Sequence, residues 1–151
     1  RLFGTQASGC APIVRLVERG DGQLVPEIPD TIARSIAIGN PADGAYAAES
    51  IRKSGGWAAS VSDTELVKGI RLLAETTRIF TETAGGVTLA GALDLARTGH
   101  FHARDEVVLC ITGNGLKTVE ALAGSLEEAP VLAPRLRDVA DLVARTPTTS
   151  R

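Results

Sequence analysis

The sequence predicts an α/β protein built in three layers, in which a parallel or mostly parallel sheet carries helices on both faces. Two observations lead to this fold class. Short strand-like runs alternate with segments of helical periodicity along the chain. One run, residues 107–111 (VVLCI), is apolar without alternation, which is typical of a central parallel strand covered on both faces. Ligands of such sheets bind beyond the carboxyl ends of the strands, so the loop after this run is the first candidate site.

The first half of the chain contains one predicted strand and three predicted helices. The strand covers residues 2–7, and a helix follows at residues 10–19, with a proline tolerated in its first turn. Residues 20–29 contain two glycines and two prolines, which indicate a loop. An aspartate can cap a helix over residues 30–38, which a glycine ends and a proline prevents from continuing. A further helix covers residues 42–54 and is closed by two glycines.

A strand and the best-specified helix of the chain follow. Residues 57–61 are strand-like. Ser62 and Glu65 form an S-x-x-E capping box, and the apolar residues behind them recur at helical spacing. Residues 79–80 indicate a short strand, and residues 81–86 (TETAGG) form a corner of small residues.

The last part of the chain alternates in the same way. A helix that is apolar nearly all round covers residues 87–97, and the apolar strand at residues 107–111 comes next. A weaker helical stretch follows at residues 119–126, and a last helix lies around residues 136–143. We expect the polar end of the chain, residues 146–151, to be frayed.

Composition places the chain among ordinary folded proteins and excludes several classes of function. The 151 residues are enough for a single domain, residues 1–151, that buries most of its apolar surface. A net charge of -2, without a basic stripe, argues against nucleic-acid binding. No apolar run approaches the ~18 residues of a membrane span and no signal peptide is evident, so the default compartment is the cytoplasm.

The sulfur-containing residues give two expectations. Cys10 and Cys110 are the only cysteines, and we expect two reduced thiols, with Cys110 buried in its strand as a small apolar residue. The chain contains no methionine and begins at Arg1 directly in strand-like sequence, so we expect it to be part of a longer polypeptide.

The loop after residue 111 matches neither of two standard glycine-rich nucleotide-binding motifs. Residues 113–118 begin like G-x-G-x-x-G, but Thr118 stands in place of the third glycine, and no acidic-ended strand follows at the required distance. The G-x-x-x-x-G-K-[ST] pattern of a Walker A loop is absent. Nucleotide binding is therefore a weak alternative.

Individual side chains leave several alternatives open. His100 and His102 lack further ligands, so we predict solvated loop residues and no metal site. Glu82 is either a functional acid that needs a partner in its glycine-bearing corner, or a helix N-terminal acid favoured by the helix dipole. Thr112 either contributes a hydroxyl to a site at the end of the strand or caps the next turn. The spacing of residues alone does not indicate a catalytic triad of serine, histidine and an acid.

Several motifs in register resemble one family. Their order and separation are similar to the C-terminal half of threonine synthase, and the resemblance covers residues 1–118, while residues 119–151 resemble its variable tail. The motifs are LFGTQASGCAPIVR (2–15), IAIGNP (36–41), SGGWAASVSDTE (54–65), IFTETAGGVTLAG (79–91) and ITGNGLKT (111–118).

The resemblance implies a fold and a reaction. Threonine synthases are fold type II enzymes that depend on pyridoxal 5'-phosphate (PLP), so the chain would form the C-terminal half of a fold type II PLP domain. The implied activity is that of a lyase, which converts O-phospho-L-homoserine and water to L-threonine and phosphate. The TETAGG corner departs from the EPASA-like corner of many relatives, which leaves a related PLP dehydratase or cysteate synthase as an alternative.

The resemblance also implies which residues bind the cofactor. Thr112 would hydrogen-bond the pyridine nitrogen of PLP. A neutral hydroxyl does not hold this nitrogen protonated, so the ring would withdraw electrons less strongly. Four residues would line the ring beside it: Glu82, Ala84, Gly85 and Gly113.

The family's remaining site residues lie outside this sequence. Its Schiff-base lysine belongs to a serine-phenylalanine-lysine-aspartate motif in the N-terminal half, where the phosphate-binding glycine loop is also found, and neither motif occurs here. Lys53, Lys68 and Lys117 belong to other motifs. We therefore expect no catalytic residue in this chain, no activity of the chain alone, and the N-terminal half of the same protein as its partner.

Two further classes of function stay open. The chain would be a stand-alone, non-enzymatic α/β module if the loop at residues 113–115 binds an anion or another ligand. It would be a regulatory or assembly domain if it forms a stable homo-oligomer without ligand affinity. The resemblance also implies an exposed apolar patch where the N-terminal half would pack.

Overall fold

The computed structural model describes residues 1–20, 22–126 and 130–145. Within these residues the chain forms two short strands, five α-helices and three short 3-10 helices. The strands are β1 (Gly4–Ala7) and β2 (Ala58–Val61), and the α-helices are α1 (Pro12–Arg19), α2 (Gly44–Lys53), α3 (Asp63–Thr77), α4 (Thr83–Arg97) and α5 (Leu136–Arg145). The 3-10 helices are η1 (Arg34–Ile36), η2 (Gly115–Lys117) and η3 (Val119–Leu122).

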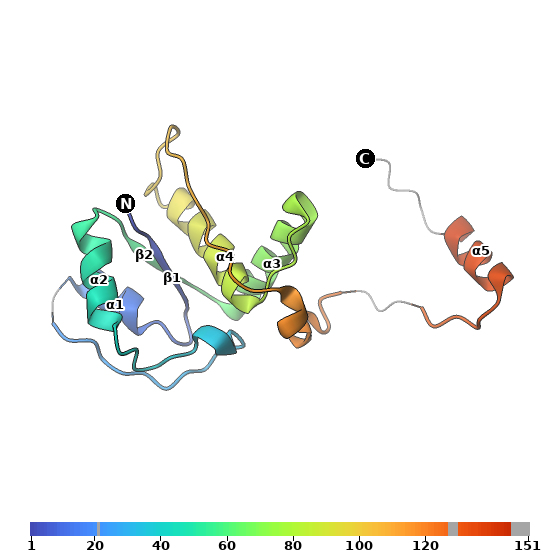
Figure 1. Cartoon of the computed structure of the whole chain (residues 1–151), viewed down its shortest axis with the longest axis horizontal. Helices are drawn as coiled ribbons and strands as arrows, with labels where there is room; N and C mark the ends of the chain where they lie inside the picture. Colours follow the sequence, from blue (N-terminus) through green and yellow to red (C-terminus); the bar gives the residue numbers. More distant parts are fainter. Residues whose placement is uncertain (21, 127–129, 146–151) are drawn as a thin grey trace.

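The two strands form a parallel sheet with helices on both faces, as predicted. Gly4 of β1 lies opposite Ala58 of β2, and Ala7 lies opposite Val61. Helices α1 and α2 lie on one side of the strands, and α3 and α4 lie on the other (Figure 1). The described residues thus form three layers around a two-stranded sheet.

Each face of the sheet has its own hydrophobic core, because neighbouring residues of a strand point to opposite faces. Ala7 and Val61 face α3 and α4, where they pack in one cluster with Leu66, Ile70 and Val87. The other face packs against α1 and α2 in a second cluster, whose buried members are Ala11, Val14, Leu16, Val17, Ala48, Ile51 and Ala58.

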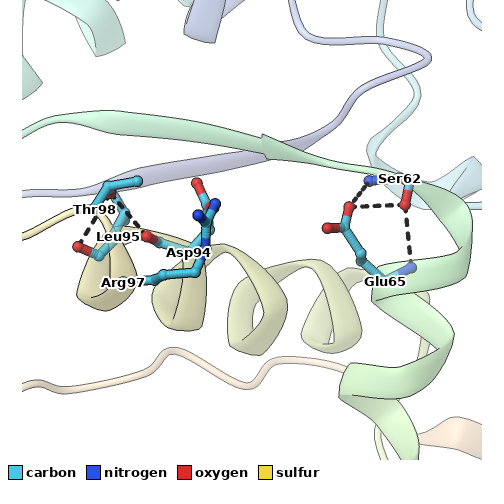
Figure 2. Close-up of polar contacts among 6 residues, drawn as sticks. All are labelled: Ser62, Glu65, Asp94, Leu95, Arg97 and Thr98. Atoms are coloured by element: carbon cyan, nitrogen blue, oxygen red, sulfur yellow. Dashed lines mark hydrogen bonds and ion pairs between the residues drawn. The ribbon is translucent and has the colours of Figure 1, made fainter.

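Local sequence signals explain how α1 and α3 begin. Gln6 of β1 accepts hydrogen bonds from the backbone N–H groups of Ile13 and Val14 at 2.9 and 3.0 Å, so it takes the place of a side-chain cap on α1. The predicted capping box of α3 is confirmed. Glu65 N–H donates to Ser62 Oγ at 3.3 Å, and Ser62 N–H donates to Glu65 Oε2 at 2.7 Å (Figure 2).

Helices α3 and α4 approach each other closely at two glycines. A Cβ added to Gly86 would lie 2.5 Å from the carbonyl oxygen of Leu66, and one added to Gly69 would lie 2.6 Å from the carbonyl oxygen of Gly86. This contact seats α4 between α3 and the sheet. The far end of α4 is held by Thr98, whose hydroxyl donates to the carbonyl of Asp94 at 2.8 Å (Figure 2).

Helix α4 begins at Thr83, four residues earlier than predicted. The small-residue corner at residues 81–86 therefore contains the first helical turn. Its glycines can continue the helix because their backbone is packed against neighbouring elements, which outweighs their low helix propensity.

The predicted helix at residues 30–38 is wrong, since only η1 forms there. Asp30 does not cap a helix: its N–H donates to the carbonyl of Gly9 at 2.9 Å. The segment is instead fastened to α3, because the Asp63 carboxylate accepts hydrogen bonds from the Thr31 hydroxyl and from the N–H of Ile32. Tertiary hydrogen bonds thus replace the helical ones that the pattern predicts.

The predicted buried strand at residues 107–111 is also wrong in this structure. The segment has no strand pairing, Val108 is 86% exposed, and Cys110, expected to be buried, is exposed. A strand requires a neighbour for its backbone groups, and no described segment pairs with this one.

The other short elements differ from the predictions in smaller ways. Residues 79–80 form no strand, although Thr81 beside them forms an isolated antiparallel bridge with Asn114. The helix expected at residues 119–126 shortens to η3, and the last helix is confirmed as α5. The expected fraying of residues 146–151 concerns residues outside the described part. Within the described ranges, none of the helices combines the length and the apolar character needed to cross a bilayer.

Candidate functional site

Two segments far apart in the sequence meet at the start of α4. The backbone N–H of Glu82 donates to the carbonyl of Gly113 at 3.2 Å, and the N–H of Gly115 donates to the carbonyl of Phe80 at 3.0 Å. Thr81 and Asn114 form the antiparallel bridge between them. The structure therefore brings together the TETAGG corner and the TGNGLK loop, the two motifs on which the sequence-based site rests.

Thr81 fastens the loop to the corner through its side chain. Its hydroxyl donates to the carbonyl of Gly113 at 3.0 Å, and the residue is only 1% exposed. A Cβ added to Gly85 would lie 1.9 Å from this hydroxyl, so only glycine fits there. Sequence reasoning missed Thr81, because a partner 32 residues away leaves no local signal.

Glu82 is an almost fully buried carboxylate with one charged partner. It is 5% exposed, and its Oε2 lies 2.9 Å from the ammonium Nζ of Lys117. The geometry is that of an ion pair without a hydrogen bond, since Oε2 has no hydrogen-bonded partner. Both interpretations of Glu82 agree with the structure, because its carboxylate has Lys117 as a charged partner and the residue occupies the N-cap position of α4, where its side chain makes no capping hydrogen bond.

Gly113 lies directly against Glu82. A Cβ added to Gly113 would approach the carboxylate carbon of Glu82 to 2.1 Å, so a larger residue would displace the acid or the loop. The small size of Gly113 and Gly85 therefore serves the contact between the protein's own segments. Both glycines position the corner and the loop relative to each other.

Thr83, at the first position of α4, carries a second buried polar atom without a hydrogen bond. The residue is fully buried and its Oγ1 has no partner, while its backbone N–H donates to Thr118 Oγ1 at 3.3 Å. Native proteins contain few such unpaired atoms. Sequence reasoning missed Thr83 as well, and nothing in its immediate sequence signals it.

The two remaining predicted site residues lie nearer the surface. Thr112 is exposed, since the segment that leads to it is unpaired, and Ala84 is half-buried in the first turn of α4. Thr112 is thus an exposed residue that precedes Gly113, the glycine that lies against Glu82.

The three lysines are distributed over different parts of the structure. Lys117 is engaged by Glu82, and Lys53 on α2 lies 2.7 Å from Glu49 in a surface ion pair. Lys68 lies on α3 beside a shallow hollow between α3 and α4.

The described residues offer no candidate metal site. They contain no group of three or more histidine, cysteine or acidic side chains that could hold an ion. His100 is stacked on the Trp57 ring, with 5.5 Å between ring centroids, and His102 is exposed.

Comparison with known sequences identifies relatives over most of the chain. Residues 1–113 match the family described as pyridoxal-phosphate dependent enzyme. A threonine synthase from Methanocaldococcus jannaschii is 39% identical over 130 residues, which are 85% of this chain and 32% of the relative. A threonine synthase from Bacillus sp. (strain ULM1) is 40% identical over 117 residues, which are 78% of this chain and 31% of the relative. The chain thus spans about a third of the length of these relatives.

Comparison with solved structures supports the fold. Maize serine racemase superposes with a TM-score of 0.63 over 83% of this chain and 40% of its own, at 18% sequence identity. The T.th. threonine deaminase superposes with a TM-score of 0.51 over 63% of this chain and 34% of its own, at 21% identity. Both likenesses concern the fold alone.

Proposed function

Because this chain belongs to the pyridoxal-phosphate dependent enzyme family, we propose that it is the C-terminal part of a threonine synthase-like lyase. The complete enzyme would convert O-phospho-L-homoserine and water to L-threonine and phosphate. One observation carries the proposal: the relatives at 39% and 40% identity are threonine synthases, and the motifs shared with that family meet in space at the start of α4. The remaining two thirds of such an enzyme would be the partner of this chain.

The residues at the start of α4 fit one edge of a PLP site. The cofactor, when bound, supplies an electron sink for carbanion chemistry. The Thr112 hydroxyl would hydrogen-bond the pyridine nitrogen, because it is exposed while the neighbouring carboxylate of Glu82 is buried and paired with Lys117. A neutral hydroxyl does not hold that nitrogen protonated. Gly113 and Gly85 would keep the loop and corner in position, and Ala84 would add a small half-buried side chain beside them.

We also propose that the chain alone is inactive. Covalent attachment of PLP requires a lysine, and Lys117 is held by Glu82, while Lys53 and Lys68 lie on α2 and α3, away from the loop. The test is to add PLP to the isolated chain. We expect no stable absorbance band that disappears when one of the three lysines is substituted, and such a band would contradict the proposal.

A chimera tests the activity itself. This chain replaces its counterpart in the M. jannaschii threonine synthase, and phosphate release from O-phospho-L-homoserine is measured with PLP. We expect release of phosphate together with formation of L-threonine. A folded, PLP-containing chimera that releases no phosphate, or that forms a 2-oxo acid from L-threonine faster than it releases phosphate, would favour a dehydratase-like relative.

A further inference from the structure

The turn that follows Thr112 brings a lysine back onto the start of α4. Asn114 caps η2 by accepting a hydrogen bond from the N–H of Leu116 at 2.9 Å, and the N–H of Lys117 donates to the carbonyl of Asn114 at 3.1 Å. The turn returns the side chain of Lys117 to Glu82, where Nζ lies 2.9 Å from Oε2. Hydrogen bonds of the turn therefore hold the backbone from which this lysine reaches the buried acid.

The carboxylate of Glu82 also lies close to the predicted cofactor contact. A Cβ added to Gly113 would lie 2.1 Å from the carboxylate carbon, and Thr112 is the residue before Gly113. This contact places the carboxylate within about 8 Å of the Thr112 backbone. Salt screens exposed charges over about 8 Å at physiological ionic strength and screens buried charges much less. The charge of Glu82 therefore acts on any group that Thr112 binds.

Lys117 is the only cation among the described residues that pairs with Glu82. The charged residues of the elements packed beside this corner are exposed or bonded elsewhere: Arg34 of η1, Glu120 of η3, and Asp63, Glu65, Lys68, Arg71 and Glu75 of α3. On α4 itself, Asp94 and Arg97 pair with each other in the last turns. The balance of charge at the start of α4 is thus set by one ion pair.

We propose that Lys117 is a positioning residue of the cofactor site, which neutralises Glu82 and so prevents this carboxylate from favouring protonation of the PLP ring nitrogen at Thr112. The inference rests on the proposed function, which supplies the cofactor and its contact with Thr112. A negative charge nearby stabilises the protonated form of a nitrogen base. A hydroxyl partner carries no charge of its own, so the protonation of the ring depends on the charges around it.

Two substitutions change this charge balance in opposite directions. Lys117→Met leaves the carboxylate uncompensated, whereas Glu82→Gln leaves the ammonium uncompensated. The double variant Lys117→Met/Glu82→Gln removes both charges, and Lys117→Arg keeps both. Each is made in the chimera described above, and the absorbance of bound PLP is recorded across a range of pH. The pH midpoint of the absorbance change reports how readily the bound cofactor takes up a proton.

We expect the midpoint to follow the charge. Lys117→Met should raise it by about 0.5–1 pH unit, because the carboxylate then favours the protonated cofactor. Glu82→Gln should lower it by a smaller amount, since the remaining ammonium of Lys117 is largely exposed and screened. The double variant and Lys117→Arg should both have midpoints near that of the unsubstituted chimera.

Two results would overturn the proposal. An unchanged midpoint in Lys117→Met would show that the carboxylate does not act on the cofactor. Equal, shifted midpoints in Lys117→Met and in the double variant would show that a displaced loop, and not the charge, is the cause. If Lys117→Met does not fold, Glu82→Gln and the double variant are compared instead. The double variant should have the higher midpoint, and equal values would contradict the proposal.

Lys53→Met is the matched control for the loss of a lysine. Lys53 pairs with Glu49 on α2, and both side chains are exposed. The variant has the same net charge as Lys117→Met, and we expect the midpoint of the unsubstituted chimera. A shift as large as that of Lys117→Met would indicate an effect of net charge and would contradict a specific role of Lys117.

The measurement does not require turnover. A chimera that shows the expected shifts but releases no phosphate would support the role of Lys117 and reject the threonine synthase activity. An active chimera whose midpoint does not respond to Lys117→Met would do the reverse. A folded chimera that binds no PLP would overturn both proposals.

Discussion

The ammonium of Lys117 lies 2.9 Å from Oε2 of Glu82, a carboxylate that is almost fully buried at the start of α4. The lysine itself is largely exposed, so the pair joins a surface loop to a buried corner. Burying an ionised carboxylate costs free energy unless a partner compensates its charge. Among the described residues, Lys117 is the only charged partner of Glu82.

Lys117→Met should therefore destabilise the chain. The substitution keeps a long apolar side chain but leaves the Glu82 carboxylate buried and unpaired, which we expect to lower the free energy of unfolding by about 1–3 kcal/mol. Urea unfolding at neutral pH measures the change. Adding Glu82→Gln to Lys117→Met should recover part of the loss, because the buried charge is then gone.

Lys53→Met is the matched control for the loss of a lysine. Lys53 and Glu49 form an ion pair in which both side chains are exposed, so we expect a change within about 0.5 kcal/mol. If Lys117→Met were as mild as Lys53→Met, the Glu82 and Lys117 pair would have no structural role.

Gly113→Ala should separate the loop from the corner. Its new Cβ would approach the Glu82 carboxylate to 2.1 Å, and we expect a loss of about 1–3 kcal/mol in the free energy of unfolding. A double-mutant cycle identifies the cause. In a Glu82→Ala background the same substitution should cost clearly less, since the clashing side chain is absent. An unchanged cost would show that the loop backbone, not the contact with Glu82, requires glycine.

The elements that could be predicted from the sequence are those defined by local signals. Ser62 and Glu65 carry their whole capping motif within four residues, and the strand at residues 57–61 is bounded by glycines and by that cap. The strand predicted at residues 107–111 does not form, for the opposite reason. Its apolar pattern describes a strand paired on both sides, and the described residues supply neither neighbour.

The candidate site divides in the same way. Glu82 and Gly113 were selected from motifs, and the structure places them in contact. Thr81 and Thr83 were not selected, because their roles depend on Gly113 and Thr118, which lie more than thirty residues further along the chain. A hydroxyl gives no sequence signal of a partner at that distance.

Glu65→Ala should have a pH-dependent effect on stability. The backbone N–H of Ser62, followed by its hydroxyl, lowers the pKa of the Glu65 carboxyl. A carboxyl with a lowered pKa in the folded state stabilises that state above its unfolded pKa, and this contribution is lost as the pH falls through the folded pKa. We therefore expect Glu65→Ala to cost about 1 kcal/mol at neutral pH and less as the pH falls from about 5 toward 3.

Glu75→Ala is the matched control on the same helix. Glu75 lies near the C-terminal end of α3, where a negative charge is not favoured by the helix dipole, and its ion pair with Arg71 is long and exposed, at 3.9 Å. Urea unfolding at several pH values should show little loss for Glu75→Ala at any of them. Equal pH profiles for the two variants would rule out a specific contribution of the capping box.

Thr112→Val tests the proposed cofactor contact. The two side chains have similar shapes, and Thr112 is exposed, so the free energy of unfolding should change by less than about 0.5 kcal/mol. In the active chimera, kcat should fall about five- to tenfold, because one neutral hydrogen bond of about 1 kcal/mol would be missing from the transition state. The absorbance spectrum of bound PLP should also shift, which a purely structural role would not cause.

Thr76→Val is the matched control. It lies on the exposed side of α3, where it removes a hydroxyl that bonds only to the carbonyl of Leu72, and it should leave both kcat and the spectrum unchanged. Unchanged kinetics and spectrum in Thr112→Val would remove this residue from the site.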